Sequence, residues 1–384
     1  MANVDLAKAK NDKNDEFYTQ YADIQAEINA YIEYDPDVFR GKTILLPCDD
    51  PEWSNFTKFF AQNFENFGLK KLISTSYAIE SRRIKEWEPT LFETTNPNFD
   101  ADKSKTNGKI FVLERDVNGS GKIDIDDLEW QYLEGDGDFR SDEVKRLRDE
   151  ADIIITNPPF SLFREFLAWI VEGGKKFSII GNMNAITYKE VFPLIRENRI
   201  WLGASIHSGD REFGIPDYYP VEAAGWRIDP QGKKFIRVKG VRWFTNLEHG
   251  RRHEPLQLMS QADNLKFNKK KLPNGYAHYD NYDAIEIPSI EVIPSDYSGV
   301  MGAPISFLDK YCPEQFEILG SADNVAWLAS IGVKPMGERT IRQLREQGNK
   351  AHVTANMTSL YFVDESGVNL PYKRILIRKK QVEQ

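Results

Sequence analysis

The chain has 384 residues, a net charge of −9, 41% hydrophobic residues and 12% aromatic residues. This length and apolar content predict two folded domains, or one large α/β domain with an appendage, and exclude a disordered chain. Two cysteines are too few for a disulfide framework, and the sequence contains neither an apolar leader nor a run of about 18 apolar residues. We therefore expect a protein of the cytoplasm with no membrane partner.

Short apolar strands alternate with helical patterns from the first residues to about residue 202. The expected helices are residues 15–31 (entered through Thr19), 56–67, 162–171 and 189–196. The expected strands are residues 43–46, 71–75, 110–113, 151–156, 176–180 and 200–202, with a later hairpin of residues 226–228 and 234–244. This alternation predicts a mostly parallel, doubly wound sheet.

Two stretches depart from this alternation. Residues 86–107 are rich in Pro, Thr, Asn and Lys, which predicts an exposed insertion. After about residue 255 the alternation ends and Pro, Asn, Tyr and Gly become frequent, so we place a domain boundary there.

The charge is unevenly distributed. Residues 227–271 contain 12 Lys and Arg against 4 Asp and Glu, although the whole chain is acidic. A basic segment of this kind predicts a face that binds a polyanion, and ordinary solvated surface charge is the alternative. The candidate backbone contacts are Lys233, Lys234, Arg237, Lys239, Arg242, Arg251, Arg252, Lys269 and Lys270.

The most informative segment is Asn157-Pro158-Pro159-Phe160, directly after the apolar run of residues 151–156. Two prolines end the strand in a rigid, extended corner whose carbonyl groups are free to accept hydrogen bonds. With an amide before this corner and an aromatic ring after it, the segment can hold an exocyclic amino group and stack on a flat ring. This chemistry is typical of a methyltransferase that acts on the amino group of a base; a simple Pro-Pro turn is the alternative.

Three further segments contain polar and aromatic groups suited to a cofactor, because ligands of open α/β sheets bind at the carboxyl ends of strands. Residues 47–56 follow the first strand and contain two Asp, but lack the glycines of a nucleotide loop. Residues 135–141 combine two glycines with an Asp and a Phe, and residues 15–21 place polar groups at a helix start. Each of these segments is also explained by a capping motif or a turn.

The chain resembles the EcoRI-type adenine-N6 DNA methyltransferase family, with a γ-like order of motifs. The segments that carry this resemblance are residues 48–51, 54–56, 135–141, 156–165 (TNPPFSLFRE), 180–182, 185–190, 243–249 (WFTNLEH), 279–285 and 300–304. They span nearly the whole chain.

The resemblance implies a Rossmann-like α/β catalytic domain in residues 1–255 and a DNA-recognition region in residues 256–384. The catalytic residues that it implies are Asn157, Pro158, Pro159 and Phe160. The contacts with S-adenosylmethionine that it implies are Tyr18, Thr19, Pro47, Cys48, Asp49, Asp50, Asn55, Asp138 and Phe139. The glycine-poor loop at residues 47–56 departs from the general methyltransferase pattern.

We therefore expect methyl transfer from S-adenosylmethionine to N6 of a flipped-out adenine in double-stranded DNA, with a cognate restriction endonuclease as a further partner. The same chemistry on cytosine N4, RNA or a protein glutamine is one alternative. A catalytically silent DNA-binding protein is another, of a different class.

One acidic segment is independent of this function. Residues 116–127 match the oxygen-ligand spacing of a calcium loop, with an Asp in place of the usual Glu at its twelfth position. The candidate ligands are Asp116, Asn118, Ser120, Asp124 and Asp127, and a Gly-rich acidic turn is the alternative.

Overall fold

The computed structural model describes residues 18–50, 54–78, 91–207, 210–215, 225–321, 325–349 and 359–381. The chain divides into two compact units. Unit 1 comprises Met1–Ala185 and Ile200–Gly250, and unit 2 comprises Ile186–Arg199 and Arg251–Gln384. The division at about residue 255 into a catalytic domain and a recognition region stays a prediction.

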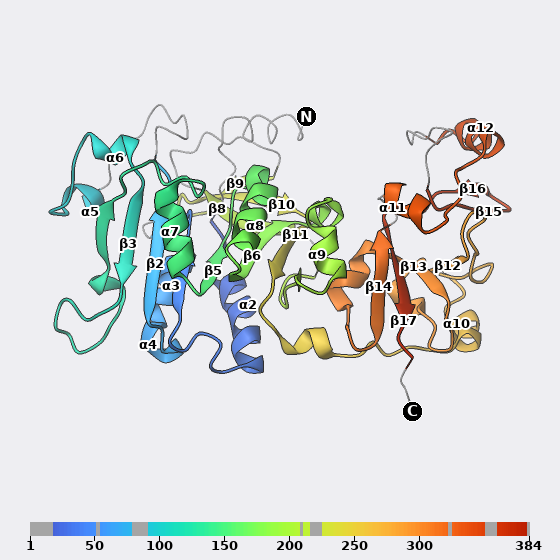
Figure 1. The fold of residues 1–384 in the computed structure, drawn as a ribbon, viewed down its shortest axis with the longest axis horizontal. Coiled ribbons are helices and arrows are strands. Elements are labelled where there is room, and N and C mark those ends of the chain that lie inside the picture. The colour runs from blue at the N-terminus through green and yellow to red at the C-terminus, as the bar shows by residue number, and fades with distance from the viewer. Residues whose placement is uncertain are drawn as a thin grey trace. The chain divides into compact units, whose positions relative to one another are not determined.

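Unit 1 is built around a mixed sheet whose eight described strands have the order β4-β3-β2-β1-β5-β6-β11-β7 (Figure 1). The strands are β1 Thr43–Leu46, β2 Lys71–Ser76, β3 Lys109–Leu113, β4 Glu129–Tyr132, β5 Ile153–Thr156, β6 Lys176–Asn182, β7 Trp201–Leu202 and β11 Val241–Thr245. Strands β2, β1, β5 and β6 are parallel, whereas β3, β4, β11 and β7 pair antiparallel. The expectation of a mostly parallel sheet is correct only for these four central strands, of which β1 and β5 are wholly buried.

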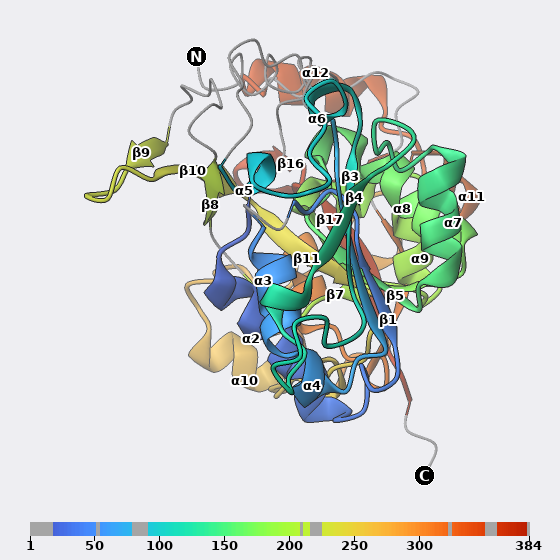
Figure 2. The same ribbon diagram turned by 90° about the vertical axis from the view of Figure 1, so that its left-hand side faces the viewer.

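Helices cover both faces of this sheet. The described helices of unit 1 are α2 Tyr21–Tyr34, α3 Asn55–Gln62, α4 Phe64–Phe67, α5 Leu91–Thr94, α6 Lys103–Thr106, α7 Asp142–Glu150 and α8 Phe163–Glu172. Figure 2 shows α2 and α3 on one side of β1 and β5, and α7 and α8 on the other. The predicted apolar stripe of α2 packs into the core, where Ile24 and Ile28 are fully buried. Unit 1 therefore has the predicted doubly wound arrangement.

Two helix predictions need correction. Helix α2 begins after Gln20, one residue later than an entry through Thr19. The single helix expected over 56–67 is two helices, because the side-chain amide of Asn63 donates to the Phe59 carbonyl oxygen at 2.9 Å and ends α3. Side-chain hydrogen bonds of this kind compete with helix continuation.

Two elements of unit 1 have no clear sequence signal. Helix α7 is highly charged and buries only Val144 and Arg148, so its sequence lacks the apolar periodicity that would predict a helix. Strand β4 extends the sheet beside β3 and completes an antiparallel edge. The predicted insertion contains α5 and α6, while its residues 86–90, like residues 15–17 of the first predicted helix, lie outside the described residues.

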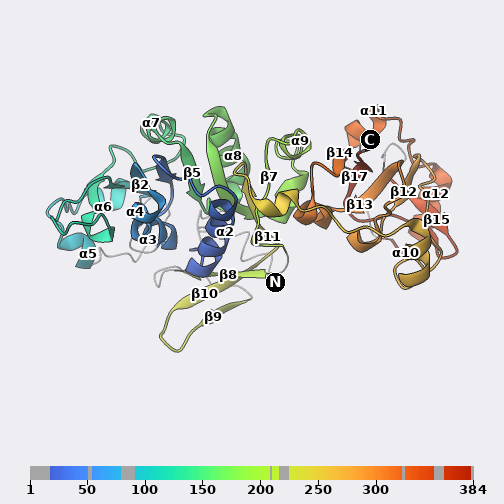
Figure 3. The ribbon, with the colours of Figure 1, turned by 90° about the horizontal axis from the view of Figure 1, so that it is seen from below.

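A separate three-stranded sheet in unit 1 contains β8 Asp210–Ile215, β9 Trp226–Ile228 and β10 Lys234–Lys239, in the order β8-β10-β9 (Figure 3). The antiparallel pairing of β9 and β10 confirms the predicted hairpin. The strand expected over 234–244 is divided at Gly240, whose φ of +68° turns the chain from β10 into β11 of the large sheet.

Unit 2 contains a four-stranded sheet of order β12-β13-β17-β14 and a two-stranded sheet β15-β16 within the described residues. Its strands are β12 Ala284–Glu286, β13 Val300–Pro304, β14 Phe316–Ser321, β15 Phe362–Asp364, β16 Gly367–Asn369 and β17 Arg374–Lys379. Its helices are α9 Phe192–Arg196, α10 Gln261–Phe267, α11 Val325–Ser330 and α12 Glu338–Glu346. Helix α9 is shorter than the helix expected over 189–196, and Pro193 lies in its first turn.

Across the described ranges, no helix combines the length and apolar content that a membrane crossing requires.

Candidate active site

The carboxyl ends of the central parallel strands form one edge of the large sheet. Strand β1 lies between β2 and β5, with Ile44 beside Leu72 on one side and Ile153 on the other. The loop that begins at Pro47 and the segment that begins at Asn157 therefore leave neighbouring strands at the same edge. This is the position at which open α/β sheets bind ligands.

The Asn157–Phe160 segment forms a rigid corner at this edge. Asn157, Pro158 and Pro159 are buried, and Pro159 has extended backbone angles at the start of a short 3₁₀ turn. Phe160 is half-buried, and its ring meets the ring of Phe213 edge-on with centroids 6.4 Å apart. The Phe160 ring therefore packs against the core of unit 1 beside the corner.

The loop after β1 contains a turn that the sequence does not reveal. Cys48 has φ +70°, a left-handed conformation that usually favours glycine. A cysteine thus adopts the conformation for which a nucleotide-binding loop would normally use glycine. This accounts physically for how a glycine-poor loop still turns sharply at the end of the strand.

Asp49 connects this loop by hydrogen bonds to Ser54, before α3, and to Thr156, at the end of β5. Its carboxylate accepts hydrogen bonds from the Ser54 hydroxyl at 2.7 Å and from the Thr156 hydroxyl at 2.5 Å, and the residue is 4% exposed. The Thr156 hydroxyl also lies 2.6 Å from the Pro47 carbonyl oxygen, so its single proton has two acceptors. The loop after β1 and the last residue of β5 are consequently fixed to each other directly before Asn157.

The main chain of Asp49 forms further hydrogen bonds with β2 and α3. Its N–H donates to the Thr75 carbonyl oxygen at 2.7 Å, and its carbonyl oxygen accepts from the hydroxyls of Thr57, at 3.2 Å, and Ser74. Ser54 caps helix α3, because its hydroxyl accepts from the N–H of Phe56 at 3.0 Å. The roles of Thr57, Ser74 and Thr156 have no sequence signal, since single hydroxyl residues occur throughout the chain.

The Tyr18–Thr19 segment lies against the same loop. The Asn55 side chain donates to the Thr19 carbonyl oxygen at 2.7 Å. Tyr18 forms two main-chain hydrogen bonds of 2.8 Å with Gly214 of β8, next to the residue that contacts Phe160. The hydroxyl oxygens of Thr19 and Thr75 are buried and accept or donate no hydrogen bond within the described residues.

Residues 135–141 also reach this edge, beyond the end of β2. Gly137 has φ +83°, and a Cβ there would clash with the Ser76 carbonyl oxygen, so only glycine permits this approach. The Ala78 N–H donates to the Asp136 carbonyl oxygen at 2.8 Å. This close packing places Asp138 and Phe139 near the strand ends.

Asp138 and Phe139 differ in their surroundings. Asp138 accepts hydrogen bonds from the Arg140 guanidinium at 2.6 and 2.9 Å, and this carboxylate raises the pKa of Arg140. Phe139 is 4% exposed, with ring contacts to Phe166 and Trp169 of α8 at centroid distances of 5.1 and 5.7 Å. The proposed cofactor contacts of both residues stay predictions.

The predicted DNA contacts fall on several elements. Lys233, Lys234, Arg237 and Lys239 belong to the β9–β10 hairpin or its turn, and Lys269 and Lys270 are exposed after α10. Arg242 and Arg252 are each 4% exposed, and their guanidinium groups donate to the His207 carbonyl oxygen and to the Asn198 side chain respectively. The prediction of phosphate contacts is therefore wrong for Arg242 and Arg252, because both guanidinium groups are buried on partners inside the protein.

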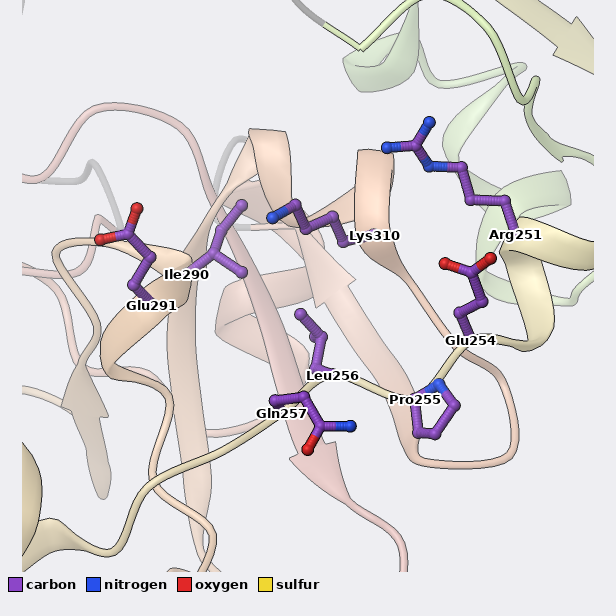
Figure 4. Close-up of a pocket in the computed structure, with 8 residues that line it drawn as sticks. All are labelled: Arg251, Glu254, Pro255, Leu256, Gln257, Ile290, Glu291 and Lys310. Atoms are coloured by element: carbon purple, nitrogen blue, oxygen red, sulfur yellow. The ribbon is translucent and has the colours of Figure 1, made fainter.

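The remaining predicted contact, Arg251, lines a pocket of about 380 Å³ in unit 2 (Figure 4). Lys310, Glu254 and Glu291 bring charges of both signs to this pocket. It contains none of the predicted catalytic or cofactor residues.

The acidic loop at residues 116–127 is held by its own main chain. Asp116 accepts hydrogen bonds from the N–H groups of Gly119 and Gly121 at 2.6 and 2.7 Å. Asp127 accepts three main-chain N–H bonds, which lower the pKa of its carboxyl group. The described part of the chain contains no cluster of three or more His, Cys, Asp or Glu side chains placed to hold a metal ion.

Comparison with known proteins identifies the family. The model of the family described as "Adenine-specific methyltransferase EcoRI" matches residues 5–380. Type II methyltransferase M.EcoRI of Escherichia coli is 43% identical over 314 residues, which cover 82% of this chain and 88% of that protein. Type II methyltransferase M.MpnI of Mycoplasma pneumoniae is 33% identical over 83% of this chain and 85% of its own length.

A further relative, Type II methyltransferase M.MgeORF184P of Mycoplasma genitalium, is 33% identical over 83% of this chain and 86% of its own length. No solved structure matches the chain. The family match extends over nearly the whole sequence and includes the Asn157–Phe160 segment at the sheet edge. The chain therefore belongs to the EcoRI family of adenine-specific methyltransferases.

Proposed function

We propose that this methyltransferase transfers the methyl group of S-adenosylmethionine to N6 of an adenine that is flipped out of double-stranded DNA. One observation carries the proposal: the Asn157–Phe160 corner and the loop after β1 leave adjacent strands and are joined through the Thr156 hydroxyl. A base held at the corner would thus lie next to any ligand held by the loop.

The chemistry follows from the groups at the corner. The N6 lone pair of adenine is delocalised into the ring, so the amine is a poor nucleophile. Hydrogen bonds from this amine to the Asn157 side-chain oxygen and the Pro158 carbonyl oxygen favour a tetrahedral nitrogen with a localised lone pair. Because both acceptors belong to a buried, proline-locked corner, they need little reorganisation during the reaction.

The same edge suits the methyl donor. When bound, S-adenosylmethionine supplies an electrophilic sulfonium methyl group. The buried hydroxyls of Thr19 and Thr75 offer hydrogen bonds to its polar groups, and the half-buried Asp50 supplies a carboxylate. Asp49 accepts hydroxyl hydrogen bonds from within the protein through both of its carboxylate oxygens, so we assign it to positioning the loop.

Phe160 is assigned to stack on the flipped adenine. Extrusion of a base costs a few kcal/mol of pairing and stacking. The edge-on contact with Phe213 fixes the Phe160 ring and limits the entropy that stacking would otherwise lose. Exposed cations on the β9–β10 hairpin and after α10 are assigned to DNA phosphates, which predicts strong salt dependence.

We further propose that the modification protects cellular DNA, in the cytoplasm, from a restriction endonuclease of the same specificity. The names of the relatives, which are Type II methyltransferases, support this role. Plasmid DNA methylated by this chain should resist an endonuclease whose site coincides with the methylated sequence.

The test is incubation with labelled S-adenosylmethionine and unmethylated duplex DNA, followed by mass spectrometry of the nucleosides. We expect N6-methyladenine in the wild-type reaction and none with Asn157→Ala. N4-methylcytosine as the only product would overturn the choice of base. Label in RNA or protein alone would overturn the choice of acceptor, and failure to bind S-adenosylmethionine in calorimetry would leave a silent DNA-binding protein.

A further inference from the structure

The β9–β10 hairpin of unit 1 projects from the large sheet as a preorganised arm (Figures 2 and 3). Its turn is fixed by the Asp229 carboxylate, which accepts hydrogen bonds from the N–H groups of Gln231 and Lys233 at 2.9 and 2.8 Å. Gly232, at φ +85°, completes the turn. The tip is therefore ordered before it meets any partner.

The root of this arm lies beside the candidate active site. Ile236 of β10 pairs with Phe213 of β8, both side chains are 1% exposed, and the Phe213 ring contacts Phe160. The turn begins about three residues beyond Ile236, roughly 10 Å along the strand at the usual rise per residue. The tip is thus within a few base-pair steps of a base held at Phe160.

One apolar side chain stands on the same face of the arm but outside the core. Directly paired residues of an antiparallel sheet share a face, and Ile236 pairs with Trp226 while Lys234 pairs with Ile228. Ile228 therefore shares the face of Phe213 and Ile236. Unlike those two buried residues, it is 52% exposed.

The charge of the arm points to the partner. Residues 225–240 contain five Lys and Arg against a single Asp, whereas the whole chain has a net charge of −9. Arg227 and Arg237 form ion pairs with Glu212 and Asp210 of β8, which brace the arm. Lys233 and Lys239 are exposed on it. An exposed apolar side chain flanked by cations fits a nucleic-acid duplex better than an acidic or apolar protein surface.

We infer that the β9–β10 hairpin enters the DNA duplex next to the target adenine and that Ile228 contacts the base stack opened by flipping. Lys233 and Lys239 meet the flanking phosphates. This inference rests on the proposed function and extends it, because it assigns to a segment outside the sheet edge the stabilisation of the opened duplex. Ile228 is a positioning residue: it does not touch the reacting atoms.

The experiment compares Ile228→Ala with wild type on two duplexes that contain the methylated sequence, once that sequence is mapped on plasmid DNA. One duplex is fully matched, and the other has an abasic site opposite the target adenine, so that the base is already unpaired. We expect single-turnover methylation to fall about tenfold on the matched duplex and less than threefold on the abasic duplex. Lys233→Ala and Lys239→Ala should each reduce the slope of log affinity against log salt by about 0.9.

Val117→Ala is the matched control, because Val117 is 51% exposed in the acidic loop of the same unit. Ile228→Leu, which keeps an apolar side chain, should restore the rate. Equal rates of Ile228→Ala and wild type, or an equal loss on both duplexes, would overturn the inference while wild-type methylation still supports the proposed function. Absence of N6-methyladenine in the wild-type reaction would instead overturn the proposed function.

Discussion

Asp49 of unit 1 and Glu286 of unit 2 are buried carboxylates that are stabilised in different ways. In unit 1, Asp49 accepts hydrogen bonds from the hydroxyls of Ser54 and Thr156, which belong to other segments. In unit 2, Glu286 of β12 pairs with the Arg374 guanidinium at 2.5 Å and accepts a hydrogen bond from Tyr279. The first network joins loops at the edge where a ligand would bind, whereas the second joins strands within a sheet. The comparison teaches that similar buried polar groups serve a site in one unit and a fold in the other.

Loss of the Asn157 amide should have the largest effect on activity. Asn157→Ala is expected to lower kcat about 10²–10³-fold, because one of two acceptors for the target amine is removed. Calorimetric binding of S-adenosylmethionine should remain. Asn246→Ala, which removes a half-buried amide at the opposite, amino end of β6 in unit 1, should leave kcat unchanged. Retained turnover in Asn157→Ala would contradict the role of this side chain.

Loss of the Arg374 guanidinium should have the largest effect on stability. Arg374→Met leaves the 7%-exposed Glu286 carboxylate without its cation, and breaking such a buried pair costs about 3–5 kcal/mol. Denaturant unfolding measures the loss. Arg378→Met is the control, since Arg378 pairs with Glu317 at the surface, where an ion pair contributes about 0–1 kcal/mol. Similar losses in the two variants would show that the buried pair with Glu286 stabilises unit 2 no more than the surface pair with Glu317.

The hydroxyl network of unit 1 should show an intermediate effect. Thr156→Val removes the donor shared by Asp49 and Pro47, and a buried acceptor left without its donor costs about 1–3 kcal/mol. We also expect weaker binding of S-adenosylmethionine, because the loop after β1 loses its tie to β5. Thr156→Ser keeps the hydroxyl and should restore both values; equal binding by Thr156→Val would show that the tie is dispensable for the site.

The pH dependence should be the smallest effect, since it vanishes at neutral pH. Burial, and then the Glu286 carboxylate, raise the pKa of Tyr279 well above its usual value. Because the folded-state pKa is the higher one, the stabilisation is complete below the unfolded pKa of about 10 and is lost as pH rises through the folded pKa. Burial and Glu27 have the same effect on Tyr31 in unit 1.

Denaturant unfolding measured between pH 8 and 12 therefore distinguishes the contributions of the two tyrosines to the alkaline loss of stability. Tyr279→Phe should flatten the alkaline loss of stability of unit 2, and Tyr31→Phe that of unit 1. An alkaline loss that is identical in wild type and both variants would show that neither tyrosine governs it.

The fold was partly readable from the sequence. The short, mostly apolar runs that form β1 and β5 predicted central strands, and the apolar stripe of α2 predicted a helix packed on the sheet. Strand β3 was predicted over residues 110–113, but its antiparallel direction was not, because strand direction depends on partners distant in sequence. Strand β4 and the charged helix α7 were not predicted, and α7 has too few apolar residues to give a helical pattern. The division of the predicted 234–244 strand at Gly240 was also not predicted, because a glycine permits a positive φ but does not require it.

By itself, the sequence determined the family and the Asn157–Phe160 corner, because two prolines after an apolar strand restrict the backbone locally. Only the tertiary structure decided what surrounds this corner. Thr156 reaches Asp49 across 107 positions, Cys48 takes a left-handed turn, and Phe213 braces Phe160 from a separate sheet. These contacts arise from the pairing of β1 with β5 and the packing of β8, and long-range packing of this kind leaves no local pattern in the chain.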